Sequence, residues 1–303
     1  MASTVRTLAD KGLIRPPKFV AENTHYETMM GSVAYGVSSD TSDVDVYGFC
    51  IPPKEMVFPH LAGDIPGFGR QKKRFDQYQQ HHIDVADELG GRGRVYDVSI
   101  YNIVKYFSLC MENNPNLIDS LFTPQSCVLH ITKIGNRVRE SRHRFLHKGC
   151  WPKFKGYAYS QLHKMAGKNP TGKRRELREE FGYDVKFAYH VVRLLDEAEQ
   201  ILTHGDVDLQ RNREHLKAIR RGEVSEEDLR RWASDKEQQL ENVYHQSNLP
   251  HGPDEPAIKK LLLECLEEHY GSLEGCIVEP DAATQALREV REVLQRYDRL
   301  LPG

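Results

Sequence analysis

The stretch Gly31–Gly48, GSVAYGVSSDTSDVDVYG, decides the fold. It places Asp43 and Asp45 two residues apart at the start of an apolar, β-rich run, Val44–Ile51. Because side chains two apart on a strand share a face, we expect the two carboxylates to lie close together. Such like charges are unfavourable unless a cation lies between them, and oxygen ligands favour Mg²⁺ or Mn²⁺ together with substrate phosphates. The stretch therefore predicts a metal site whose remaining ligands come from the phosphates of a nucleotide.

A glycine–serine turn precedes these aspartates. Gly31 and Ser32 follow a short apolar-rich run, Tyr26–Met30, and are expected to open a short helix over Val33–Val37. Backbone N–H groups at this turn, together with the Ser32 hydroxyl, are suited to hold an anionic group. The turn and the aspartate pair are therefore predicted to bind opposite sides of one triphosphate.

The sequence around this stretch, up to about residue 150, predicts mixed α and β structure. The segment Arg94–Ile100 alternates as a half-buried strand does, and a helix is expected over Tyr101–Met111. Asn114 and Pro115 should end it before a second short helix. The Gly-rich and charged segment Pro59–Arg74 is expected to be a loop, and His81-His82 a surface pair just before a strand.

Beyond Trp151 the β-rich runs stop and helical periodicity takes over. Helices are expected around Phe187–Leu194 and in three further amphipathic segments, with a turn-rich linker at Gln246–Pro256. Those three segments are Glu226–Val243, Ala257–His269 and Leu287–Leu301. We therefore predict two domains, residues 1–150 and residues 151–303.

Composition narrows the class of protein. The chain has 303 residues, and its 42 Lys and Arg against 44 Asp and Glu leave a net charge of -2, which offers no global attraction for nucleic acid. The charge is uneven, because Trp151–Arg193 carries +6 and the remainder -8. Six scattered cysteines without a CxxC pair argue against disulfides and cysteine-bound zinc. With no apolar run of membrane-spanning length and no signal-peptide core, we expect a cytoplasmic protein without a membrane partner.

The pattern G-S-x-A-x-G followed by S-D-x-D resembles the signature of the DNA polymerase beta superfamily of nucleotidyltransferases. The matching residues are Gly31, Ser32, Gly36, Ser42, Asp43 and Asp45. The resemblance implies that the Gly-Ser pair contacts the triphosphate and that the aspartates bind the catalytic metals. It also implies the fold class, which is α+β, with a small mixed-sheet, polymerase-beta-like domain followed by an all-helical domain.

Members of this superfamily have a third carboxylate on a later strand, which activates the attacking hydroxyl. Asp97 in the segment RVYDVSIYN is the candidate, because an unpaired carboxylate in a strand needs a partner. Asp84 and Asp87 in HHIDVADE are the alternatives. The catalytic and metal set that the sequence predicts is therefore Asp43, Asp45 and Asp97.

The second half of the chain is similar to the nucleotidyltransferases associated with RNA ligase in bacterial and phage RNA repair operons. Four segments carry this resemblance: NNPNLIDSLF (Asn113–Phe122), FKGYAYSQLHKM (Phe154–Met165), RELREEFGYDVKFAYHVVRLL (Arg175–Leu195) and AIRRGE (Ala218–Glu223). It implies transfer of NMP from an NTP such as ATP to an acceptor, with an RNA end as the expected acceptor.

Two groups of basic residues in this half are candidate binding sites. Lys186, His190 and Arg193 follow helical spacing, so they form one stripe that is predicted to bind the triphosphate. A dense basic run near Tyr157 and Tyr159 suits single-stranded RNA through phosphate pairing and base stacking. Its candidate residues are Lys164, Lys173, Arg174 and Arg175.

Three functions stay open at this point. The first is metal-dependent transfer of NMP to an RNA end, and the second is transfer to a protein or small molecule. The third is a nucleotide-binding sensor that has lost turnover. The preferred NTP, the oligomeric state and the role of the last ~50 residues are not readable from the residues.

Overall fold

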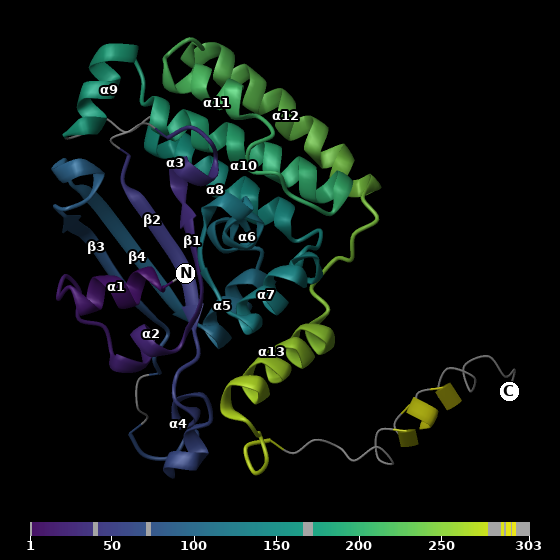
Figure 1. The fold of residues 1–303 in the computed structure, drawn as a ribbon. Coiled ribbons are helices and arrows are strands. Elements are labelled where there is room, and N and C mark those ends of the chain that lie inside the picture. The colour runs from purple at the N-terminus through teal and green to yellow at the C-terminus, as the bar shows by residue number, and fades with distance from the viewer. Residues whose placement is uncertain are drawn as a thin grey trace, which may run out of the picture.

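The fold was analysed in a computed structural model, which describes residues 2–38, 42–70, 74–165 and 172–277, and residues 286–287, 289–291 and 293–294. It is an α+β fold in which one mixed sheet is packed between helices (Figure 1). The predicted fold class is therefore confirmed.

The sheet has five strands in the order β3-β4-β2-β1-β5. They are β1 (Thr24–Met30), β2 (Val44–Cys50), β3 (Gln77–Val85), β4 (Arg94–Asn102) and β5 (Val128–Ile131). Strands β2 and β4 are parallel, and the other neighbours are antiparallel. Gly48 lies where β1 and β2 approach most closely, because a Cβ there would be 1.9 Å from the carbonyl oxygen of Tyr26. The glycine in VDVYGFC thus permits this pairing.

Strand alternation separates two buried faces. Val44 and Val46 of β2 and Val98 of β4 pack with α1 (Thr4–Asp10) and α2 (Lys18–Glu22). Residues at the alternate positions, such as Phe49 and Tyr101, join the large core beneath the helical part. Asp45 and Asp97 occupy these alternate positions too. They therefore lie on the same face of the sheet as Phe49 and Tyr101, which is the face that packs against the helical part.

Helices cover this second face and continue beyond it. The helices within the first half of the chain are α3 (Gly31–Ala34), α4 (Lys54–Val57), η1 (Pro59–Ala62), η2 (Leu89–Gly91), α5 (Ile103–Met111), α6 (Pro115–Phe122), η3 (Gln125–Cys127), α7 (Lys133–Glu140) and η4 (Arg142–Phe145). Those of the second half are α8 (Cys150–Met165), α9 (Lys173–Phe181), α10 (Val185–His204), α11 (Arg213–Arg220), α12 (Glu226–Gln246) and α13 (Glu255–Tyr270).

Helix α10 is the central element of the helical part. Asp184 caps its start by accepting hydrogen bonds from the N–H groups of Lys186 and Phe187. Helices α8, α11 and α12 pack around it, which explains why α10 is buried on most sides (Figure 1). Because such a cap fixes the first turn of a helix, it also fixes the position of Lys186 within that turn.

The last long helix returns to the first half of the chain. Helix α13 lies beside α5 and α7 (Figure 1), and Arg137 of α7 forms an ion pair of 2.6 Å with Glu268. Beyond its end, the carbonyl oxygen of Ser272 accepts a hydrogen bond from Lys54 Nζ at 2.6 Å. One continuous core therefore runs through both predicted domains.

Several predicted elements differ from the structure in extent. The helix expected over Val33–Val37 is the single turn α3, and His81-His82 lie inside β3 rather than before a strand. Part of the expected loop Pro59–Arg74 is the short helix η1. Of the helix expected over Leu287–Leu301, residues 287, 289–291 and 293–294 are helical, and the rest lies outside the described residues. Within the described ranges, no helix has the length and apolarity that crossing a membrane requires.

Candidate active site

Asp45 and Asp97 are neighbours across the two parallel strands of the sheet. Their Cα positions pair in the register of β2 and β4, so both side chains leave the same face at the same level. Both side chains are partly buried. The pairing is a direct consequence of the strand register, and it places the predicted third carboxylate, Asp97, beside Asp45.

Gly31 brings the main chain against this carboxylate pair. It follows Met30, which pairs with Asp45, and it adopts a φ of +64°. A Cβ at this position would lie 2.1 Å from Asp45 Oδ2, closer than any real contact. Glycine is therefore required here for two reasons, and its absent side chain lets the Gly31-Ser32 backbone lie against the carboxylate of Asp45.

The electrostatics of Asp45 are those of a crowded carboxylate. Burial, followed by the negative charge of Asp97, raises the pKa of Asp45 to about 6. The charge of Asp43 acts in the same direction, whereas Lys186 opposes it. A cation placed between these carboxylates would relieve the repulsion, because an opposite charge favours the ionised form.

Asp97 is held by a bulge in the neighbouring strand. The register of β3 and β4 shifts between Gln80 and Ile83, so His81 and His82 together face Asp97. The backbone N–H of His82, whose φ is +55°, donates to Asp97 Oδ1 at 2.7 Å, and His81 Nδ1 lies 3.3 Å from Oδ2. Both histidines are exposed, as expected of a surface pair, but the expectation that they precede a strand was wrong. A strand with a bulge can turn neighbouring residues toward one partner.

Asp43 and the two alternative aspartates lie at different places. Asp43 is exposed at the start of β2 and lines, with Asp84, a cavity of about 430 Å³ at the β3–β4 end of the sheet. Asp87 pairs instead with Lys11 at 2.8 Å. Asp97, rather than Asp84 or Asp87, is thus the carboxylate that faces Asp45.

The donor set suits a hard cation in its chemistry. Asp45 and Asp97 offer carboxylate oxygens, and the raised pKa of Asp45 marks a place where positive charge is lacking. Among the described residues, however, no three His, Cys, Asp or Glu side chains already converge closely enough to hold a metal ion. The structure therefore assembles the pair Asp45–Asp97, with Asp43 near it, and not a closed trio.

Positive charge approaches the carboxylates from the start of α10. Lys186 is exposed in the first turn of this helix, and its charge acts on Asp45. His190, one turn further, is half-buried with its ring 4.1 Å from that of Tyr189. Burial, followed by the charges of Arg193, Lys186, Arg174 and Arg220, lowers the pKa of His190 well below its ordinary value. Several cations therefore converge around one neutral imidazole.

Arg193 does not belong to this exposed group, which corrects the predicted phosphate-binding stripe. It is 5% exposed and donates to both carboxylate oxygens of Glu197 at 3.0 Å and to Asp119. Tyr35 donates to the same Asp119 at 2.8 Å, and the Arg193 guanidinium lies over the Tyr35 ring. Helical spacing placed Arg193 near the Lys186 face, but the two buried carboxylates draw it into the core.

The residues predicted to bind RNA are divided among several contacts. Arg174 lies over the Phe187 ring and pairs with Asp184 at 3.0 Å, so it is close to the start of α10. Arg175 pairs with Glu179 on the surface, and Lys164 is exposed on α8. Lys173 is the first residue of α9, and its side chain lies outside the described part of the structure.

Arg220 is a basic residue near the site that the sequence reasoning did not single out. It donates to the carbonyl oxygen of Val37 and lies 5.7 Å from the centre of the Tyr189 ring. Gln210 donates to the carbonyl oxygen of Ala34 at 3.1 Å, so α11 and the loop before it hold residues 34–37. The signal was available, because Arg220 lies within the AIRRGE segment.

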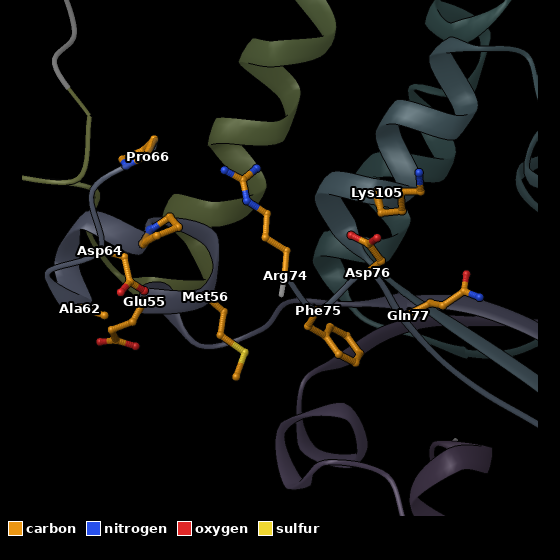
Figure 2. A pocket seen from close by; sticks show the side chains of 11 residues that line it. Glu55, Met56, Ala62, Asp64, Pro66, Arg74, Phe75, Asp76, Gln77 and Lys105 are labelled. Carbon is orange, nitrogen blue, oxygen red and sulfur yellow. The ribbon is translucent and has the colours of Figure 1, made fainter. Parts of the chain in front are cut away.

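A larger cavity lies elsewhere in the molecule. It measures about 910 Å³ and is found where β2 leads into α4, at the opposite end of this strand from Asp45. Figure 2 shows Glu55 and Asp64 on the α4 side and Lys105 of α5 across from them. It therefore does not contain the carboxylate pair.

Comparisons with known proteins identify the family of the chain. A solved structure described as a nucleotidyltransferase-like protein from Exiguobacterium sibiricum is 11% identical, with 87% of this chain and 79% of that chain covered and a TM-score of 0.28. No curated protein matches the chain. The model of the RNA repair pathway DNA polymerase beta family matches residues 18–264, which include the Gly31-Ser32 turn, the three aspartates and α10. The chain therefore belongs to the RNA repair pathway DNA polymerase beta family.

Proposed function

We propose that this protein transfers NMP from an NTP to a hydroxyl group at an RNA end, in a reaction that depends on Mg²⁺ or Mn²⁺. The observation that carries the proposal is the carboxylate pair Asp45–Asp97, in which Asp45 lies against the Gly31-Ser32 backbone and is acted on by the charge of Lys186. Oxygen ligands beside a main-chain turn and a lysine suit a triphosphate with its divalent cation.

Each part of the site has a distinct task in the proposed reaction. Asp45 and Asp97, with Asp43, would hold the metal, which when bound lowers the pKa of a hydroxyl and neutralises phosphate charge. Ser32 and the backbone of α3 would hold oxygens of the triphosphate, and Lys186 would pair with them from α10. The acceptor oxygen then attacks the α-phosphorus, the bond to the bridging oxygen breaks, pyrophosphate leaves, and the hydroxyl proton passes to water.

The acceptor assignment rests on the family and on the basic surface beside the site. Lys164 and Arg175 are exposed, and the Tyr159 ring on α8 is 50% exposed. Cations and an exposed aromatic ring suit a single strand, which is bound through its phosphates and by stacking. We propose that this surface takes the RNA strand next to the end that accepts the nucleotide.

An acceptor panel tests the proposal. The protein is incubated with each α-labelled NTP and Mg²⁺, together with RNA of varied 3′ ends, DNA, a protein mixture or buffer alone. Label should enter RNA, and chelation of the metal should stop it. Label on protein or on a small molecule would replace the acceptor assignment, and no label with any acceptor would favour a nucleotide-binding protein without turnover.

A pair of charge reversals tests the RNA surface separately. Lys164→Glu together with Arg175→Glu should weaken RNA binding and reduce its dependence on salt, since fewer counterions are released. The control is Lys259→Glu together with Lys260→Glu, which makes the same charge change at exposed positions of α13. Equal RNA affinity of all three proteins at several salt concentrations would place the RNA elsewhere.

A further inference from the structure

The β3 bulge gives Asp97 two partners of different kinds. One is fixed in the main chain, namely the N–H of His82, which donates to Oδ1 at 2.7 Å. The other is the ring of His81, whose Nδ1 lies 3.3 Å from Oδ2. Because the two groups take one oxygen each, together they define both the position and the rotation of the carboxylate.

The His81 ring is itself oriented from the other side. Its Nε2 lies 2.8 Å from the amide nitrogen of Gln79, and an amide nitrogen is a donor. His81 Nε2 is then the acceptor, so in the neutral ring Nδ1 carries the hydrogen and directs it toward Asp97 Oδ2, 3.3 Å away. Gln77 donates in turn to the side-chain oxygen of Gln79 at 3.1 Å, which fixes the Gln79 amide. A row of side chains two residues apart thus leads along one face of β3 to Asp97.

Asp97 needs this support because of what lies opposite. Its neighbour in the register is Asp45, whose pKa is raised by burial and by the charge of Asp97 itself. Left alone, a carboxylate in this position would rotate away from its like-charged neighbour. The described residues do not yet close a metal site, so the orientation of Asp97 decides whether its oxygens can join those of Asp45.

We propose that His81 is a positioning residue, which acts with the His82 N–H to hold Asp97 in the orientation that binds the divalent cation beside Asp45. The inference rests on the proposed function and deepens it. It assigns a role to a residue that does not touch the substrate. Partners of this kind, which orient a metal ligand through a hydrogen bond, commonly change metal affinity or activity by about 10–100-fold when they are removed.

The test compares His81→Ala with His81→Asn, because the side-chain amide of asparagine can donate a hydrogen bond from nearly the position of Nδ1. The controls are His251→Ala and His251→Asn, which change an exposed histidine in the turn before α13. The first readout is Mn²⁺ binding to the whole protein, which is measured as the loss of the free-ion electron paramagnetic resonance signal. Asp45→Asn identifies the bound signal that belongs to this site. The second readout is the rate of nucleotide transfer as a function of Mg²⁺ and NTP.

His81→Ala should weaken Mn²⁺ binding and lower kcat by about 10–100-fold, and His81→Asn should recover most of both. The KM for NTP should stay within about threefold, because Gly31, Ser32 and Lys186 are unchanged. Mn²⁺ affinity of His81→Ala within twofold of wild type would overturn the inference, and so would His81→Asn as weak as His81→Ala.

The two proposals fail in different ways. If the wild-type protein binds Mn²⁺ at Asp45 but transfers no nucleotide, the proposed function fails, and the Mn²⁺ comparison alone decides the role of His81. If the wild-type protein binds no Mn²⁺ at Asp45, both proposals are overturned.

Discussion

Two clusters of carboxylates in this protein show opposite solutions to the same electrostatic problem. In the core, Asp119 and Glu197 both accept hydrogen bonds from Nη1 of Arg193, and all three side chains are buried. On the sheet, Asp45 and Asp97 face each other, and the cation whose charge lowers the pKa of Asp45 most is the exposed Lys186. The cation of the first cluster is buried together with its carboxylates, whereas the cation that acts on the second is exposed.

The place of the cation distinguishes a structural cluster of carboxylates from a binding site. Arg193 joins α10 to α6, and through Asp119 to Tyr35 at the end of α3, so its contacts stay within the protein. The Asp45–Asp97 pair is partly open and electrostatically unfavourable, and it becomes favourable only when a cation arrives from outside. An unfavourable arrangement that the fold maintains is typical of functional sites.

The largest expected effect breaks the enclosed cluster. Arg193→Met should lower the free energy of unfolding by about 3–5 kcal/mol, because it leaves two buried carboxylates without their partner. Denaturant unfolding at neutral pH measures it. The control is Arg211→Met, which removes an exposed arginine 3.9 Å from Glu199 and should cost no more than about 1 kcal/mol. A stable Arg193→Met protein with a raised KM for NTP would restore the predicted phosphate-binding role.

The next prediction concerns the Asp45–Asp97 pair, where removal of a negative charge should stabilise the folded protein. The folded-state pKa of Asp45 is about 6 against an ordinary 3.8, so the folded protein holds this proton more tightly than the unfolded chain does. Its contribution to stability is therefore present at low pH and is lost as the pH rises from about 4 to about 6. Asp45→Asn should raise the free energy of unfolding at pH 7 by up to about 3 kcal/mol and remove this pH dependence.

Unfolding of Asp45→Asn and of Asp235→Asn, an exposed residue on α12, across pH 4 to 7 measures this effect. The Asp235 variant should follow the wild type throughout. An Asp45→Asn protein less stable than wild type at pH 7 would show that the pair is a structural element like the core cluster.

A substitution of Lys186 tests the contribution of the cation that acts on Asp45. Lys186→Met should raise the KM for NTP by about 10-fold or more, since a charge-assisted hydrogen bond contributes about 1.5–3 kcal/mol. It should also move the pH transition of Asp45 above 6, because the charge of Lys186 lowers the pKa of that carboxyl. The matched control is Lys259→Met on α13. An unchanged KM together with an unchanged pH transition would separate Lys186 from the site.

The smallest expected effect distinguishes two reasons for a glycine at position 31, namely its positive φ and the nearby carboxylate of Asp45. Gly31 and Gly12 have nearly the same φ, +64° and +71°, but a Cβ at Gly12 meets nothing within 4 Å, whereas one at Gly31 meets Asp45 Oδ2 at 2.1 Å. Gly31→Ala should therefore destabilise by at least about 1 kcal/mol more than Gly12→Ala. Equal losses in thermal unfolding would mean that only φ matters at Gly31.

The strands and the pairing of Asp45 with Asp97 were largely readable from the sequence. Alternation in VDVYGFC and RVYDVSI marks the two central strands, and their parallel register then sets Asp97 beside Asp45. The sequence could not show the register itself, because it depends on how distant strands meet. For the same reason the bulge at His81-His82 was missed, since two histidines in a row do not reveal that one extra residue is inserted opposite Asp97.

Helical spacing located α10 but did not decide which of its faces carries function. Lys186 and Arg193 fall on one predicted stripe, yet one is exposed and the other is enclosed. The partners that enclose Arg193 are Asp119, from α6, and Glu197, one turn further along α10. Periodicity along one helix contains no information about Asp119, so the difference became visible only in the packed structure.

The most direct test of the central claim is the transfer of α-labelled nucleotide to RNA by the wild-type protein, by Asp45→Asn and by Asp97→Asn, each with and without Mg²⁺. The account predicts labelled RNA only with the wild-type protein and Mg²⁺, while both variants remain folded. Equal labelling by the wild-type protein and either variant, or labelling that does not need a divalent cation, would contradict it.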